Sequence, residues 1–115
     1  MENAFDNGKI AVALRTARAA AGWNQQEFAD QMGVAKSSVA RIETLEMAAK
    51  GDFIIKAMRL FREAGVEVDL YAATDLPIKI SDSAIAAAVN ALKDETKRRS
   101  DRRTGIAALL PKDYD

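Results

Sequence analysis

The chain has 115 residues, which is enough for one domain with a modest hydrophobic core and an appended segment. It contains no Cys and no His, so disulfides, thiol nucleophiles and the commonest metal ligand and general base are missing; we expect no enzyme, no cofactor and no metal. The charges balance at 17 Lys and Arg against 17 Asp and Glu, so attraction to a polyanion would need a local cluster of cations. No apolar run approaches the roughly 20 residues of a membrane span, and the first residues do not resemble a signal peptide, which predicts a soluble, cytoplasmic protein without a membrane partner.

The first part of the chain predicts three short helices separated by glycines. Apolar residues recur at helical spacing over residues 10–21 and stop at Gly22. A second helix starts after Asn24, whose side chain can form a capping box with the glutamate three positions later, and ends at Gly33. A third helix follows over about residues 35–43.

The second part of the chain changes its period. A fourth helix over about residues 52–64 ends at Gly65, after which residues 66–70 and 78–80 alternate apolar and polar side chains, as strands do. A last helix is predicted over about residues 82–99. We therefore expect a mainly α protein with four helices over 8–65, a strand–strand–helix appendage over 66–103, and a tail over 104–115 that shows no clear periodicity and is open to disorder.

The two faces of the third predicted helix differ in chemistry. With successive residues about 100° apart, the apolar Val39 and Ile42 fall on one side, which suits a core. Small or donor-bearing residues share an arc of about 140° on the other side. Such a face suits a helix that lies in the DNA major groove, because its donors match base-edge acceptors and phosphates. The residues on this outer face are Lys36, Ser37, Ala40 and Arg41.

Residues 25–42 carry the pattern Gln-x-x-x-Ala-x-x-x-Gly-x-x-x-x-x-Val-x-x-Ile between an upstream and a downstream helix. This spacing resembles the helix-turn-helix of phage repressors and Cro, the XRE family, over about residues 10–69. The resemblance implies a four-helix DNA-binding domain in a transcriptional regulator, a repressor that binds double-stranded operator DNA as a homodimer. It further implies that Lys36, Ser37, Ala40 and Arg41 contact bases, and that Asn24, Gln25, Ser38 and Lys50 contact the DNA backbone.

Other positions agree with or depart from this resemblance. Asn24 and Gln25 stand at the start of the second helix, where free N–H groups and the helix dipole attract a phosphate. Relatives commonly form a partly buried ion pair at the positions of Arg18 and Glu43. Ala35, however, stands where relatives cap the recognition helix with Ser or Thr. The loop over residues 44–51 also departs from them, since Lys50 is its only cation.

Two functions stay open at this stage. The first is the repressor, and the alternative is an antitoxin that neutralises a partner toxin protein and autoregulates its operon, because such antitoxins also carry a strand directly after the fourth helix. In both cases we expect the dimer contact within residues 66–103, since two short strands alone need to be covered. Ile85, Val89 and Leu92 are expected to lie over these strands or against a second copy. The cations of residues 97–103 fit either a second phosphate contact or an ordinary charged helix end.

Overall fold

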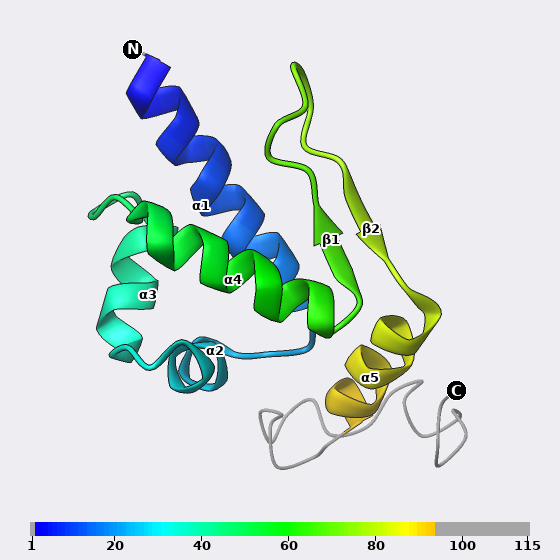
Figure 1. The fold of residues 1–115 in the computed structure, drawn as a ribbon. Coiled ribbons are helices and arrows are strands. Elements are labelled where there is room, and N and C mark those ends of the chain that lie inside the picture. The colour runs from blue at the N-terminus through cyan, green and yellow to red at the C-terminus, as the bar shows by residue number, and fades with distance from the viewer. Residues whose placement is uncertain (1, 94–115) are drawn as a thin grey trace.

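The computed structural model describes residues 2–93, and Figure 1 shows their arrangement. Helices α2 and α3 lie on one side of α4, and the β hairpin and α5 lie on the other. The mainly helical fold with two short antiparallel strands and a C-terminal helix confirms the predicted fold class. None of the described helices is long and apolar enough to cross a bilayer. In chain order the elements are α1 (Glu2–Ala20), α2 (Gln25–Met32), α3 (Lys36–Glu43), α4 (Gly51–Glu63), β1 (Val66–Val68), β2 (Ile78–Ile80) and α5 (Asp82–Lys93).

The glycines predicted to end the first, second and fourth helices do so, whereas the predicted start of the first helix is wrong. Gly22, Gly33 and Gly65 follow α1, α2 and α4 with positive φ of 80°, 70° and 86°, the left-handed conformation that glycine adopts without a steric penalty. The first helix, however, begins at Glu2 rather than at residue 10. Its early turns carry mostly polar residues, so they lack the apolar period by which a core-facing helix is recognised.

One hydrophobic core joins the helices to the hairpin. Phe28 and Phe61 are fully buried with ring centroids 5.2 Å apart, and Trp23 stacks against both rings at 6.2 and 5.8 Å. Val66 from β1 and Ala84 from α5 belong to the same core cluster. Because β1 packs against α1 and α4 of its own chain, this strand is covered without a second copy, whereas Lys79 and Ile80 of β2 are exposed.

Helix α5 packs against the rest of the chain through its small side chains. The hydroxyl oxygen of Ser81 accepts a hydrogen bond from the Ala84 N–H at 3.1 Å and so caps the helix. The larger apolar face points elsewhere, because Ile85 and Leu92 are 41% and 65% exposed and do not cover the sheet as one prediction had it. Residues 94–103 of the predicted appendage and the tail over 104–115 lie outside the described residues.

Candidate nucleic-acid interface

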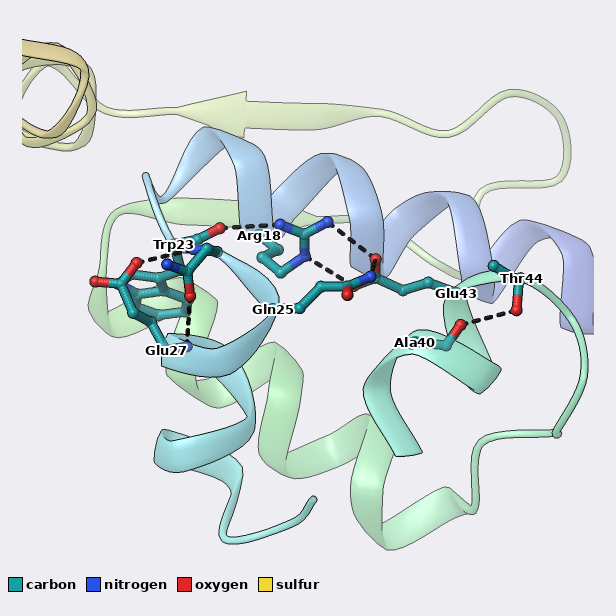
Figure 2. Close-up of polar contacts among 8 residues, drawn as sticks. Arg18, Trp23, Gln25, Glu27, Ala40, Glu43 and Thr44 are labelled. Atoms are coloured by element: carbon teal, nitrogen blue, oxygen red, sulfur yellow. Dashed lines mark hydrogen bonds and ion pairs between the residues drawn. The ribbon is translucent and has the colours of Figure 1, made fainter. Parts of the chain in front are cut away.

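The start of α2 is held by the predicted capping box. The side-chain oxygen of Asn24 accepts from the Glu27 N–H at 2.8 Å, and the Glu27 carboxylate accepts from the Asn24 N–H at 2.9 Å (Figure 2). Asn24 is exposed. The first N–H groups of a helix have no partner within it, so those of Gln25 and Gln26 stand at an end where an anion can accept from them.

The turn between α2 and α3 is built from small residues. Gly33 adopts φ 70° and ψ 32°, and the N–H of Val34 donates to the carbonyl of Ala29 at 3.0 Å. Ala29 is completely buried, as a residue at the crossing of two close helices must be. From α4, the ammonium of Lys56 donates to the Met32 carbonyl at 3.1 Å, a contact that the sequence did not predict. The end of α2 and the turn after it are thereby held both by a local hydrogen bond and by a contact from α4.

Helix α3 separates a buried face from an exposed one. Val39 and Ile42 are 1% and 5% exposed and anchor the helix. Lys36, Ser37 and Arg41 are exposed, so three of the four residues expected to contact bases reach solvent from the outer side of the helix. The fourth is Ala40, which is half-buried, as is Ser38 among the residues expected to contact the backbone.

The first turn of α3 lacks a side-chain cap. Ala35 occupies the cap position with extended backbone angles, φ −72° and ψ 146°, and it provides no side-chain hydrogen bond. The sequence predicted this departure correctly. The start of α3 is therefore one place where the fold forgoes the stabilisation that Ser or Thr would supply.

A buried polar cluster connects α1, α2 and α3. Arg18 donates through Nε and Nη2 to the two carboxylate oxygens of Glu43 at 2.8 and 2.9 Å, and Glu43 is only 4% exposed (Figure 2). This is the predicted ion pair. The side-chain amide of Gln25 also donates to Glu43, at 3.2 Å, which the sequence did not predict. One donor of the Gln25 amide is thus engaged within the protein.

The loop after α3 turns without glycine. The Thr44 hydroxyl donates to the Ala40 carbonyl at 2.8 Å (Figure 2), and Leu45 takes φ 65° to reverse the chain. Leucine is unusual in this left-handed conformation, so no local signal marked the turn. Lys50 is exposed at the start of α4, where it occupies the cap position without a side-chain cap.

The exposed groups at the start of α2 and on the outer face of α3 are mainly hydrogen-bond donors. They comprise an ammonium, a guanidinium, a hydroxyl and backbone N–H groups, which match the acceptors of phosphates and of guanine. Among residues 2–93 no three His, Cys, Asp or Glu side chains come together in a way that could hold a metal ion. The chemistry of this surface is thus that of binding an acceptor-rich polyanion.

The geometry of α2, the glycine turn and α3 defines a helix-turn-helix DNA-binding unit. Residues 14–66 match the family model described as helix-turn-helix, and they extend from the middle of α1 to the first residue of β1. This region is a helix-turn-helix of the phage repressor and Cro type, the XRE family, as the sequence pattern predicted. Neither the curated proteins nor the solved structures gave a match. The chain therefore carries the DNA-binding domain of a transcriptional regulator.

Proposed function

We propose that this protein is a cytoplasmic repressor that binds operator DNA as a homodimer and blocks transcription by occupying the site. The observation that carries this proposal is the outer face of α3, where Lys36, Ser37 and Arg41 are exposed opposite the buried Val39 and Ile42. A helix anchored in this way can enter the major groove with its donors directed at base edges.

Each residue of the interface has a distinct role in this proposal. Lys36 and Arg41 donate to guanine acceptors, and Ser37 donates to a neighbouring base. Ala40 is small enough to let the helix approach closely and to touch a thymine methyl group. The remaining contacts fix the register on the DNA backbone. They come from Asn24, Gln25, Ser38 and Lys50.

The base-reading roles can be tested once an operator has been obtained by sequencing genomic fragments that the protein retains. We expect Lys36→Ala and Arg41→Ala each to weaken operator binding by about 1–3 kcal/mol while affecting scrambled DNA less. Lys79→Ala serves as the matched control, because Lys79 is an exposed cation on β2. All variants are compared at one salt concentration. Equal losses on operator and scrambled DNA would contradict the assignment of α3 as the reading helix.

The second part of the proposal is a dimer contact on α5. A single helix-turn-helix reads few base pairs, so a specific operator usually requires two copies about 34 Å apart. Ile85 and Leu92 lie four and three residues from the half-buried Val89 and leave an apolar strip exposed along one side of α5. Such a strip can pair with the same strip of a second copy around a two-fold axis.

Truncation after Gly65 is a poor test of this contact, because it would remove Val66 and Ala84 from the core. Charge substitutions on the strip avoid that difficulty. We expect Ile85→Glu with Leu92→Glu to give monomers in light scattering and to weaken operator binding, whereas Ala87→Glu, at another exposed position of α5, leaves the dimer intact. A double variant that stays dimeric would place the contact elsewhere.

A further inference from the structure

A groove lies between the first half of α1, the end of α3 and the turn of the β hairpin. Its lining comes from residues between 8 and 15, from residues 43–45 and from residues 73–76. Its volume is about 680 Å³, and small-molecule sites in proteins usually measure about 300–1,000 Å³. The proposed DNA contacts come from other residues, so this groove has no role in the function proposed above.

Both walls of the groove are tied to α1. On one side the ammonium of Lys9 donates to the Ala72 carbonyl at 3.0 Å and holds the hairpin turn against the helix. On the other side the guanidinium of Arg18 holds Glu43, the last residue of α3, through two hydrogen bonds. Figure 2 shows the end of α3 at Thr44 beside α1. The groove is therefore formed in the protein without a ligand, as most small-molecule sites are.

Large apolar side chains line the groove without being buried in it. Val12 of α1 is 53% exposed, and Leu45 of the loop after α3 is 58% exposed. The half-buried Leu76 of the hairpin turn lines the same groove. Single exposed apolar residues are ordinary, but three elements here contribute an apolar side chain to one concave surface. Such a surface suits the hydrocarbon part of a ligand.

Leu45 reaches this position through a strained backbone. Leu45 and Asp75 are the two described non-glycine residues with positive φ, each at 65°, and both line the groove. Aspartate tolerates this conformation, because its short polar side chain can bond locally, whereas leucine does not. Strained backbone of this kind concentrates at sites that bind ligands. The strain at Leu45 places in the groove an apolar residue that the fold itself leaves largely exposed.

The groove also holds a cation that is free to bind an anion. Arg15 is exposed, and among the side chains of residues 6–93 its guanidinium has no hydrogen-bond or ion-pair partner. Of the carboxylates that line the groove, Glu43 is already paired with Arg18. Asp75 remains, against the two cations Lys9 and Arg15, so the lining has one positive charge in excess. A ligand with a single negative charge would balance it.

We propose that this groove binds a small apolar carboxylic acid. The carboxylate pairs with Arg15, whose planar guanidinium can donate two parallel hydrogen bonds to it. The hydrocarbon part lies against Val12 and Leu45 and removes their apolar surface from water. A ligand in this position also contacts the loop that ends α3, so the site adjoins the helix to which the proposed function assigns base reading.

The test uses octanoate as the probe and the full chain without DNA. We expect saturable one-to-one binding in calorimetry, with amide NMR shifts confined to the lining of the groove, whereas octylamine, with the same hydrocarbon chain and the opposite charge, binds at least about tenfold more weakly. Arg15→Gln should weaken octanoate binding by about tenfold, and Val12→Asn by about three- to tenfold. The matched controls are Arg59→Gln and Ile55→Asn, at exposed positions of α4 outside the groove, and they should bind octanoate as the unmodified protein does.

Several results would overturn this inference. Octanoate binding that does not saturate, or that Arg15→Gln leaves unchanged, would mean nonspecific adsorption to apolar surface. Equal affinity for octanoate and octylamine would exclude a carboxylate site. A lower molar mass of Val12→Asn in light scattering, together with no octanoate binding by the unmodified protein, would show that a second copy of the chain occupies the groove instead. Because none of these measurements involves DNA, their outcome is independent of the proposed function.

Discussion

Three glycines with positive φ provide a graded test of how α5 is attached. In Gly33→Ala the new methyl group meets no atom within 4 Å. The folded state of this variant is therefore destabilised only by the left-handed backbone conformation, which costs about 1–2 kcal/mol for alanine. The lower conformational entropy of its unfolded chain offsets part of this cost. In Gly22→Ala the same penalty applies, but the methyl group also meets the Cα of Ala88 at 3.2 Å and the Cβ of Ala91 at 3.4 Å. Overpacking of this kind typically adds about 1–3 kcal/mol, less where the neighbour can shift.

We therefore expect Gly22→Ala to lower the free energy of unfolding by about 1–2 kcal/mol more than Gly33→Ala does. Gly65→Ala should be the most damaging of the three, because its methyl group would collide with the hydroxyl of Ser81 that caps α5. Urea unfolding followed by circular dichroism, with equal m-values for all three, measures the differences. Equal losses for Gly22→Ala and Gly33→Ala would refute the packing of α5 against the turn before α2.

Two further substitutions test the recognition helix. Ala35→Ser should stabilise the fold by a few tenths to about 1 kcal/mol, since it supplies the missing cap; a urea midpoint that stays put or falls would mean that α3 begins elsewhere. Glu43→Gln should destabilise it by about 2–3 kcal/mol, a value below that of a fully buried pair because Arg18 is 18% exposed. Thermal or urea unfolding measures the loss, and stability equal to that of the unmodified protein would show that the cluster contributes little.

Local signals explain why the helix-turn-helix could be predicted from the sequence. Gly22 and Gly33 end helices through a backbone conformation that other residues avoid, and Asn24 starts α2 through its own side chain. The faces of α3 follow from helical periodicity alone, so Val39 and Ile42 could be assigned to the core before any fold was known. Each of these signals lies within a few residues of the element that it defines.

The features that escaped prediction depend on contacts between distant residues. The bond from Gln25 to Glu43 joins positions 18 residues apart, and nothing near Gln25 distinguishes it from an exposed side chain. Leu45 reverses the chain where a glycine would have been the recognisable signal. In α5 the large apolar residues were expected to lie over the strands or against a second copy. Within the chain the helix instead packs through small residues, with Ala84 close to Gly65 and Ala88 close to Gly22, and Leu92 is exposed.

This close approach has a consequence for how two recognition helices would be spaced on DNA. Helix α5 contacts the turn that leads into α2, and α2 is joined to α3 by a buried crossing at Ala29. The apolar strip of Ile85 and Leu92 therefore belongs to the same packed unit as the outer face of α3, with no extended linker between them. In a dimer formed through that strip, the separation of the two α3 helices would be set by rigid packing. Operator spacing would then be a property of the helix packing within each subunit.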